Sequence, residues 1–402
     1  MKKTLLILLF VSIALTFAGC FLPSENVPGI TQDPTASSTN ETLDITANPN
    51  EFEQKPMIAV SLSAVNETES AEDGAVIFNY SYQNMSLIVP DPEVADKVIV
   101  DFLNRIDQTA EHAAQILEAA KTDYPVNPNW SPYFCKITYE PVRIDTGILS
   151  LAGSYTTYSG GVHPQNSCLS ANYDLITGNV LRLSDILTDE SAADTLYRYV
   201  IEALNRQKDE NFLYDGFEST VQERMDYATS GEECWYFSHT GLCIYFSPYE
   251  IAPYASGVII AEIPYAQLTG ILNDAYFPAE AESSSGMVLP DTFNEEDLER
   301  FTQFSEVVLD NSGNKFLLYT ESAVNHIRIE TGTLNEDSTQ FVPEQTVFAA
   351  YSLTPGDAIM VESAATGGMP NLRLSYHTAQ RTIRYYIDFD VEFGNPVLVE
   401  ES

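Results

Sequence analysis

The amino-acid sequence predicts an α+β fold, with one or more antiparallel sheets packed against helices, followed by a C-terminal all-β domain of the sandwich type. Three observations lead to this fold class. The 402 residues are 44% hydrophobic and 11% aromatic, which is enough apolar material for globular cores. In the first part of the chain, strand-like runs alternate with helical runs and with hairpin-type turns. In the last part, turn signals separate short strand-like runs, with one short helix among them.

The clearest helix follows two strand-like runs, at 57–64 and 75–86. Asp91 suits the N-cap, because its carboxylate can accept a hydrogen bond from the first turn, and Pro92 suits the first helical position. Beyond them, apolar residues recur at spacings of three and four. They form one stripe that must pack on a sheet: Val94, Val98, Phe102, Ile106, Ala110, Ala113, Leu117 and Ala120.

The rest of the first domain continues this mixture of strands and helices. The run Asp174-Leu-Ile-Thr-Gly178 has the composition of a turn that joins antiparallel strands. The pattern predicts helices at 191–207 and 265–272, a hairpin with its turn near Thr240-Gly241, and strands at 133–144, 148–158, 168–174 and 258–263. This order indicates an antiparallel α+β domain over 56–278 and not a doubly wound parallel sheet.

A change in composition marks a domain boundary. Residues 279–286 read Ala-Glu-Ala-Glu-Ser-Ser-Ser-Gly, which is typical of a linker, and we expect the linker to cover 279–289. Residues 290–402 then form the second domain. After a short acidic helix near 294–301, the strand-like runs lie at 306–309, 315–320, 325–330, 345–353, 358–363, 372–376, 382–391 and 396–399. Such a series of short strands predicts a β-sandwich.

The N-terminus has the features of an export signal. Two lysines precede an apolar run over 5–17, which is too short to span a bilayer. The string Phe17-Ala18-Gly19-Cys20 resembles a bacterial lipobox, whose cysteine is lipidated after cleavage. We expect a signal peptide at 1–19, lipid on Cys20, and a flexible tether over 20–55 at the outer face of the cytoplasmic membrane. The alternative is ordinary cleavage beside an incidental cysteine.

The charge balance restricts the partners. Acidic side chains number 58 and basic ones 19, which gives a net charge of −39 at pH 7. Nucleic acids bind proteins through clusters of lysine and arginine, and the sequence has no such cluster. We therefore expect no contact with nucleic acid, contact with the membrane only through the lipid anchor, and a preference for basic partners.

Four cysteines remain when Cys20 is assigned to lipid, and an even number in an exported chain suggests disulfides. We expect Cys234 to pair with Cys243 across the hairpin, and Cys135 to pair with Cys168. A zinc site is the alternative, but there is no Cys-x-x-Cys pair, and the histidine between Cys234 and Cys243 lacks partners at ligand spacing. The sequence therefore predicts no metal site and no cofactor.

The string Gly160-Gly161-Val162-His163-Pro164 can be a turn, a ligand-contacting loop or part of a catalytic site. Two glycines and a proline are what a tight turn with positive φ requires. His163 can act as a base near neutrality, but no G-x-S-x-G motif accompanies it. We favour the turn over ligand contact and expect no catalytic residue. The isolated His112, His326 and His377 are expected to be solvated or satisfied by neighbouring groups.

The loop Pro248-Tyr-Glu-Ile-Ala-Pro-Tyr-Ala-Ser-Gly257 is the better binding candidate. Its two tyrosines and its glutamate, held between prolines, make a rigid amphipathic surface of the kind found at interface hot spots. The alternative is a packed loop that covers a sheet edge. The candidate ligand-binding residues are Tyr249, Glu250, Tyr254, Gly160, Gly161 and His163.

Two sets of strings carry a family resemblance. The first is Thr157-Tyr-Ser-Gly-Gly-Val-His-Pro164, followed by Asn172-Tyr-Asp-Leu-Ile-Thr-Gly178 and Leu183-Ser-Asp-Ile-Leu187. The second is Gly241-Leu…Phe246-Ser-Pro-Tyr-Glu-Ile-Ala-Pro-Tyr-Ala-Ser-Gly257, with Ile263-Pro-Tyr265. Together they resemble the extracytoplasmic domain of RsiV-type anti-sigma factors, which sense lysozyme, and the N-terminal part of PdaC-type peptidoglycan deacetylases. The resemblance covers residues 56–278.

The resemblance implies a sensing or binding module without the activities attached to it in those families. Sigma binding needs a cytoplasmic segment and a transmembrane helix, and only residues 1–3 precede the apolar run. The deacetylases carry paired aspartates and an H-x-x-x-H metal motif, and no such string occurs in 279–402. We therefore expect a non-enzymatic lipoprotein that binds a basic extracellular protein such as lysozyme, or peptidoglycan. A peptidoglycan-modifying enzyme and a structural envelope lipoprotein are the alternatives.

Overall fold

The computed structural model describes residues 56–231, 234–278, 283–310, 314–335, 340–363, 371–390 and 394–401. The signal peptide expected at 1–19, Cys20, the tether over 20–55 and the start of the expected linker lie outside the described residues. The predicted α+β class is confirmed, because helices pack on antiparallel sheets and the last part of the chain is rich in strands. Among the helices described, none has the length and hydropathy needed to cross a membrane.

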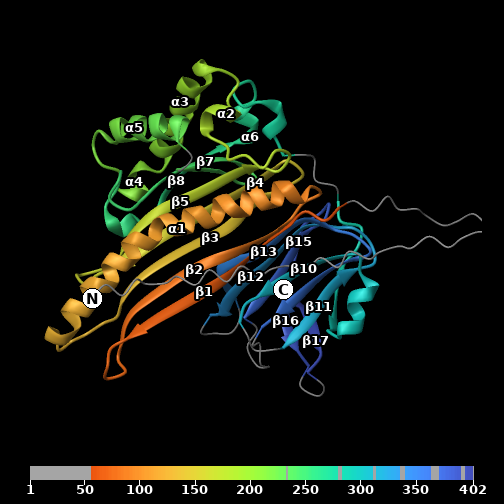
Figure 1. The fold of residues 1–402 in the computed structure, drawn as a ribbon. Coiled ribbons are helices and arrows are strands. Elements are labelled where there is room, and N and C mark those ends of the chain that lie inside the picture. The colour runs from red at the N-terminus through yellow and green to blue at the C-terminus, as the bar shows by residue number, and fades with distance from the viewer. Residues whose placement is uncertain are drawn as a thin grey trace, which may run out of the picture. The chain divides into compact units, whose positions relative to one another are not determined.

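Most strands belong to one ten-stranded sheet (Figure 1). Neighbouring strands pair antiparallel, except for β2 and β3, which are parallel. From one edge to the other the order is β17 (Pro396–Glu400), β16 (Thr382–Phe389), β15 (Leu372–His377), β12 (Val324–Leu334), β13 (Phe341–Leu353), β1 (Ala59–Ser70), β2 (Val76–Ile88), β3 (Tyr133–Ile144), β4 (Ile148–Tyr158) and β5 (Gln165–Asp174).

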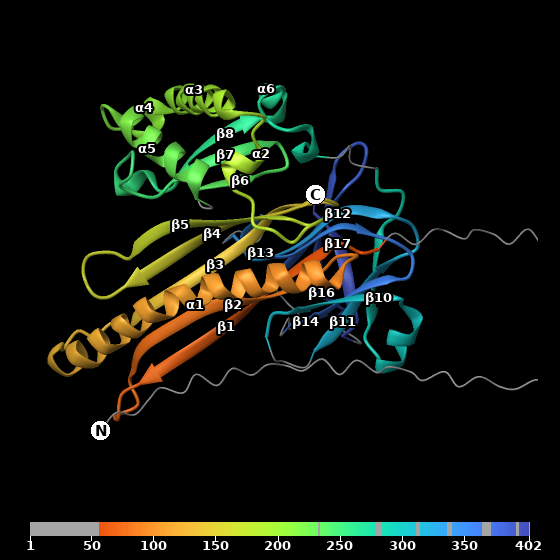
Figure 2. The ribbon, with the colours of Figure 1, turned by 45° about the horizontal axis from the view of Figure 1, so that its top comes forward.

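The parallel pair β2 and β3 requires a crossover, which α1 (Pro92–Asp123) supplies. The predicted N-cap is confirmed, because Asp91 Oδ1 accepts a hydrogen bond from the Glu93 amide at 2.9 Å. Most of the predicted apolar stripe is buried, and Figure 2 shows α1 running along β1 to β3. The buried members of the stripe are Val94, Val98, Phe102, Ile106, Ala113 and Ala120. A short 3₁₀ turn, Tyr124–Val126, follows α1.

The β2–β3 ladder is short. Only Phe78–Ser81 pair with Tyr133–Lys136. Farther along, the buried side chain of Gln83 takes the place of the ladder. Its amide donates to the Tyr139 carbonyl at 3.1 Å, and its Oε1 accepts from the Tyr139 amide at 2.5 Å. A side chain therefore satisfies the backbone groups of β3 where the two strands separate.

The side chains of β4 alternate between two layers. Leu149 and Leu151 belong to the core under α1, whereas Ile148 and Ser150 face the opposite layer. That layer, the helical lobe, is a three-stranded antiparallel sheet with five helices (Figure 2). Its elements are β6 (Trp235–Phe237), β7 (Gly241–Phe246), β8 (Ile259–Pro264), α2 (Leu183–Ile186), α3 (Glu190–Arg206), α4 (Lys208–Asn211), α5 (Phe217–Ser230) and α6 (Tyr265–Leu268), with 3₁₀ turns at Tyr254–Ser256 and Asp274–Tyr276.

A four-stranded sheet packs against the C-terminal strands of the large sheet. Its order is β10 (Gln303–Val308), β14 (Asp357–Glu362), β11 (Lys315–Thr320) and β9 (Val288–Thr292), and the 3₁₀ helix Glu295–Arg300 lies between β9 and β10. The two sheets enclose a core that also contains Met57 and Ala59 from the start of the chain. Since β1 pairs with β13, the segments before and after the expected 279–289 linker share one sheet and form one compact unit.

The sequence prediction misses the helices α2, α4 and α5 and the strand β9. The buried residues of α5 are Phe217, Val221, Met225 and Ala228. Their spacing is helical, but it is hard to recognise in the sequence because most of the residues between them are polar. Strand β9 contains Pro290, which argues against a central strand. It is tolerated because β9 is the edge of its sheet.

A buried polar pair attaches the helical lobe to the large sheet. Ser150 and Asn172 are fully buried on β4 and β5, and their side chains are hydrogen-bonded to each other. The Phe237 amide donates to Ser150 Oγ at 2.9 Å, and Asn172 Nδ2 donates to the Trp235 carbonyl at 2.9 Å. The backbone of β6 is thus held by two side chains of the large sheet.

Asn172→Ala should destabilise the protein by about 2 kcal/mol, because the Trp235 carbonyl and the Ser150 hydroxyl would each lose a partner in a dry interface. Urea unfolding measures this change. Asn166→Ala, on the outer part of the same strand, is the matched control and should change the free energy of unfolding by less than about 0.5 kcal/mol. Equal effects of both substitutions would contradict this role for the pair.

Candidate functional site

The structure brings together the two loops that the sequence analysis singles out. The turn between β4 and β5 carries Gly160, Gly161 and His163, and the loop between β7 and β8 carries Tyr249 and Tyr254. The two loops are fixed to each other by hydrogen bonds. The Cys168 amide donates to Ser247 Oγ at 3.0 Å, and the Tyr254 hydroxyl donates to the Pro164 carbonyl at 3.2 Å.

Three rings meet at this junction, and we call His163, Tyr249 and Tyr254 the aromatic patch. The rings of His163 and Tyr254 are stacked, with centroids 4.0 Å apart and an angle of 23° between their planes. The centroids of Tyr249 and Tyr254 are 5.4 Å apart, and His163 Nε2 lies 3.2 Å from the Tyr249 hydroxyl. Aromatic pairs at such separations are attractive beyond the area they bury.

The patch is open to solvent on one side. Tyr249 is 58% exposed and the neighbouring Val162 is fully exposed, whereas His163 and Tyr254 are half-buried. Tyr249 has a φ of +72°, in the left-handed region that a tyrosine rarely adopts. A residue held there costs about 1–3 kcal/mol, and such residues concentrate at ligand-binding sites.

The hydrogen bonds of His163 define its tautomer. Nδ1 lies 2.8 Å from the Pro164 carbonyl, which can only accept, so Nδ1 carries the proton. Nε2 then accepts from the Tyr249 hydroxyl. The Tyr249 oxygen keeps its lone pairs, so it can also accept a hydrogen bond.

Gly160 and Gly161 have the conformation that the sequence predicts for a tight turn. Their φ values are +89° and +115°. A Cβ atom on Gly160 would lie 2.8 Å from the Tyr133 hydroxyl, so the glycine also allows the Tyr133 ring to lie close to the backbone of the turn. These two residues shape the turn that presents His163.

Glu250 is an anchor of the loop and does not join the aromatic patch. Its Oε1 accepts from Arg224 Nε at 2.6 Å, and its Oε2 accepts from the Ser247 amide at 2.8 Å. Both charged side chains of this pair are mostly buried. Glu250 therefore fixes the loop from beneath, next to the strained Tyr249.

The patch presents aromatic surfaces that are suited to binding. Among the described residues, no carboxylate is hydrogen-bonded to His163, whose Nδ1 donates to the Pro164 carbonyl instead. Stacked rings beside an exposed tyrosine can contact a sugar face or a cationic side chain.

The predicted disulfides are wrong, because no disulfide joins the cysteines in the described part of the chain. Cys135 on β3 and Cys168 on β5 are separated by β4, where they lie opposite Thr157 and Ser154. Strands flanking a third strand are about 9.5 Å apart, too far for a disulfide.

The second pair fails for a different reason. Cys243 lies opposite Tyr236, whereas the Cys234 carbonyl accepts from the Tyr245 amide, two positions farther along β7. The Cys234 thiol accepts a hydrogen bond from Arg224. Burial raises the pKa of the Cys168 and Cys243 thiols to about 12.

The sequence analysis misses a cluster of three histidines. His239 from the β6–β7 turn meets His326 from β12 and His377 from β15, with ring centroids 5.4–6.1 Å apart. His326 and His377 are isolated in the sequence, and the fold brings them together with His239. His326 lies in a bulge of β12 and has a φ of +55°, which no pattern in the sequence indicates.

The histidine cluster does not form a metal site. Nη2 of Arg328 lies 2.6 Å from His239 Nε2 and donates to it, so a cation occupies the position where a metal would bind. In the part of the chain that the structure describes, no three His, Cys, Asp or Glu side chains are arranged to hold a metal ion. Burial and the neighbouring Arg328 lower the pKa of His239 to about 3, and burial also lowers the pKa of His326 and His377.

His239→Gln should make the protein less sensitive to acid. Between the ordinary histidine pKa of 6.5 and about 3, the unfolded chain binds a proton that folded His239 does not, so the free energy of unfolding falls as the pH falls through this window. Glutamine does not titrate, and its Oε1 can still accept from Arg328. Urea unfolding at about pH 7.5 and about pH 5 should show a smaller loss in the variant than in the wild type.

His112→Gln is the control, since His112 lies outside the cluster and contacts Tyr155. A change shared by both variants would reflect the loss of a histidine as such and not its place in the cluster. If His239→Gln loses as much stability as the wild type between the two pH values, His239 is not protonated on unfolding in this window.

Comparison with known proteins identifies part of the chain. Residues 184–266 match the family model described as "Protein of unknown function (DUF3298)". A crystal structure of a DUF3298 family member from Bacteroides fragilis NCTC 9343 has 20% identity and a TM-score of 0.40, over 54% of this chain and 94% of that chain. A DUF3298 family protein from Pseudomonas aeruginosa PAO1 has 19% identity and a TM-score of 0.39, over 55% and 97%. No curated protein matches the chain.

The matched segment contains Tyr249, Glu250 and Tyr254, whereas His163 lies before it. The aromatic patch is thus shared between this segment and the hairpin that precedes it. Residues 184–266 of the chain form a DUF3298 domain.

Proposed function

We propose that this chain is a lipid-anchored binding protein of the bacterial cell envelope, which recognises a basic extracellular protein of the lysozyme type through its aromatic patch. The observation that carries the proposal is the convergence of two separate loops on the exposed rings of His163, Tyr249 and Tyr254. The ion pair beneath the loop holds this surface in place and offsets the cost of the left-handed conformation of Tyr249. Such preorganisation reduces the entropy lost on binding.

The location rests on the N-terminal sequence. The apolar run over 5–17 and the lipobox-like string that ends at Cys20 support export and lipidation. Residues 20–55 would then hold the folded part at the outer face of the cytoplasmic membrane.

The choice of a basic partner rests on charge. A chain with a net charge of −39 attracts a cationic protein and raises the rate of association, an effect that weakens as salt rises. The resemblance of residues 56–278 to RsiV-type anti-sigma factors, which sense lysozyme, supports the same class of partner. The DUF3298 domain lies within this region.

A cell-wall glycan is the second candidate. Exposed tyrosine and histidine rings can contact sugar rings, and a tyrosine hydroxyl can accept hydrogen bonds from them. Catalysis on peptidoglycan receives no support from the patch, because His163 is bonded only to a carbonyl and a tyrosine among the described residues.

Tyr249→Ala and Tyr254→Ala should each weaken lysozyme binding at least about tenfold, which corresponds to about 1.4 kcal/mol, because each removes a ring from the centre of the proposed interface. Isothermal titration calorimetry with the full chain, at low and at physiological salt, measures the affinity. Binding by the wild type should persist at physiological salt. A parallel titration with soluble muropeptides tests the glycan candidate.

Tyr227→Ala is the matched control, since Tyr227 is a comparably exposed tyrosine on α5. The affinity of the Tyr227→Ala variant for lysozyme should stay within about twofold of the wild-type affinity. If binding disappears at physiological salt, the interaction rests on charge attraction alone and not on the aromatic patch. If neither lysozyme nor muropeptides bind, the proposal fails in favour of a structural lipoprotein.

A further inference from the structure

Three connections meet at one end of the large sheet, which we call the distal end (Figure 2). They are the β1–β2 turn, the loop between α1 and β3, and the β4–β5 turn of the aromatic patch. The strand registers bring them together. Phe78 on β2 pairs with Glu69 on β1 and with Tyr133 on β3. Phe134, the next residue of β3, pairs with Tyr158 at the end of β4.

A series of aromatic rings crosses the distal end. Each ring neighbours the next with centroids 4.8–5.9 Å apart, and we call the series the distal aromatic row: Tyr124, Trp130, Tyr133, Tyr158 and Phe134. Tyr133 is buried, whereas the other four side chains are half-buried and keep part of their surface open to solvent. Contacts at such separations stabilise the row as a unit.

The distal aromatic row reaches the turn that presents the aromatic patch. The Tyr158 hydroxyl donates to the Gly161 carbonyl at 3.3 Å, and the Tyr133 hydroxyl lies against Gly160. Residues of a strand that are an even number of positions apart share a face. Tyr158 therefore lies on the same face of β4 as Ser150, which contacts the helical lobe. The row thus continues the aromatic patch beyond the β4–β5 turn.

Hydrogen bonds to the β1–β2 hairpin hold the row in place. Trp130 Nε1 donates to the Val76 carbonyl at 3.1 Å, and the Tyr124 hydroxyl donates to Asp73 Oδ2 at 2.5 Å. The hydrogen bond from Tyr124 also lowers the pKa of Asp73, so this carboxylate stays charged at lower pH than an ordinary aspartate. Rings fixed in this way lose little freedom when a partner covers them.

The loops around the row are acidic. Segments 67–75 and 118–132 carry six acidic side chains and one lysine, Lys121, whose Nζ lies 2.9 Å from Glu118 Oε1. Glu69 and Glu72 are exposed, and neither forms an ion pair with another of the described residues. Their charge is therefore available to attract a cationic partner.

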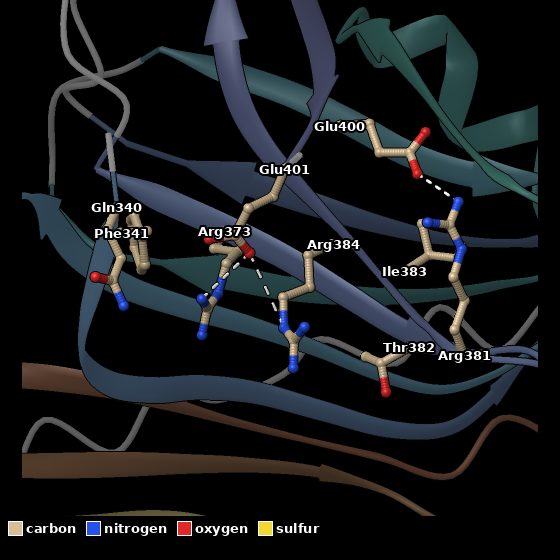
Figure 3. Close-up of a pocket in the computed structure, with 9 residues that line it drawn as sticks. All are labelled: Gln340, Phe341, Arg373, Arg381, Thr382, Ile383, Arg384, Glu400 and Glu401. Carbon is tan, nitrogen blue, oxygen red and sulfur yellow. Dashed lines mark hydrogen bonds and ion pairs between the residues drawn. The ribbon is translucent and has the colours of Figure 1, made fainter. Parts of the chain in front are cut away.

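The acidic residues of the C-terminal strands are engaged differently. They line a hollow of about 710 Å³ together with arginines (Figure 3). Arg381 Nη2 lies 2.7 Å from Glu400 Oε1, and Arg373 Nη1 lies 3.4 Å from Glu401 Oε2. Arginines of the chain itself thus occupy these carboxylates, so a cationic partner gains less there than at the distal end.

We propose that the distal end is a second contact for the basic protein that the aromatic patch recognises, and that it binds lysine and arginine side chains of that protein. The faces of Trp130 and Tyr158 attract such a cation within about 6 Å, and Glu69 and Glu72 attract it from farther away. This inference rests on the function proposed above, since both surfaces serve one partner. Contacts from several loops suit a folded protein, whose interface spans many residues.

Two variants test the distal contact by calorimetric titration of the full chain with lysozyme at physiological salt. Val126→Lys should weaken binding at least about fivefold, because it places a positive charge in the loop between α1 and β3. Val126 is 79% exposed, so this substitution leaves the fold intact. Trp130→Leu keeps an apolar side chain but removes the aromatic face, and should weaken binding at least about threefold.

Ile176→Lys is the matched control for Val126→Lys. Ile176 is 74% exposed and lies in the turn after β5, at the opposite end of that strand from the β4–β5 turn. The variant gains the same charge, and its affinity for lysozyme should stay within about twofold of the wild-type affinity.

The acidic loop is tested by association kinetics at low salt. The double variant Glu69→Gln/Glu72→Gln should bind lysozyme at least about threefold more slowly and dissociate at nearly the wild-type rate, since these charges act before contact. Glu306→Gln/Glu321→Gln is the control, because it removes the same charge from exposed positions in the C-terminal part. Its association rate should stay within about 1.5-fold of the wild-type rate.

The outcomes separate this inference from the proposed function. If Val126→Lys and Trp130→Leu bind as tightly as the wild type while Tyr249→Ala binds more weakly, the distal contact is overturned and the proposed function stands. If only the distal variants weaken binding, the distal contact stands and the aromatic patch is not the site. Equal losses for Val126→Lys and Ile176→Lys would reduce the effect to net charge and overturn the distal contact. A wild-type chain that does not bind lysozyme overturns both.

Discussion

The three-residue ladder between β1 and β13 is the connection on which the rest of the structure depends. It pairs Ala59 with Ala350, Val60 with Ala349 and Ser61 with Phe348, residues almost three hundred positions apart. Through it, the strands at the start and at the end of the chain become one sheet. Side chains of β1 then alternate between the core under α1 and the core of the C-terminal sandwich. Neither core is complete without this strand, so the two halves stabilise each other.

The position of the aromatic patch follows from that sheet through a series of buried polar contacts. Ser150 and Asn172 fix the backbone of β6, and therefore the helical lobe, on the face of β4 and β5. Within the lobe, the Glu250–Arg224 ion pair fixes the loop that carries Tyr249. If the Glu250 carboxylate moved away, the guanidinium of Arg224 would be left as a buried charge without this ion pair. The cost of that state holds the loop in one arrangement. The exposed rings are thus supported by groups that a ligand does not touch.

Local patterns allow much of the fold to be predicted. The N-cap at Asp91 and the apolar stripe of α1 depend on neighbours within a few residues, and the strands of the second half follow turn signals. Contacts between distant segments are different, because no short pattern encodes them. The β1–β13 pairing, the meeting of His239, His326 and His377, and the place of β4 between Cys135 and Cys168 are of this kind. For the patch, sequence alone singles out both loops but cannot show that His163 stacks on Tyr254.

The short β2–β3 ladder has a mechanical consequence. A force applied between Met57 and the aromatic patch is transmitted through β1, β2, β3 and β4, because these neighbouring strands connect the two points in the sheet. The β1–β2 ladder runs along the whole of β1, and β3–β4 is similarly long, whereas β2 and β3 share four residue pairs and the side chain of Gln83. Shear would therefore concentrate at this seam, and α1, which joins the two strands and packs across them, carries the load there.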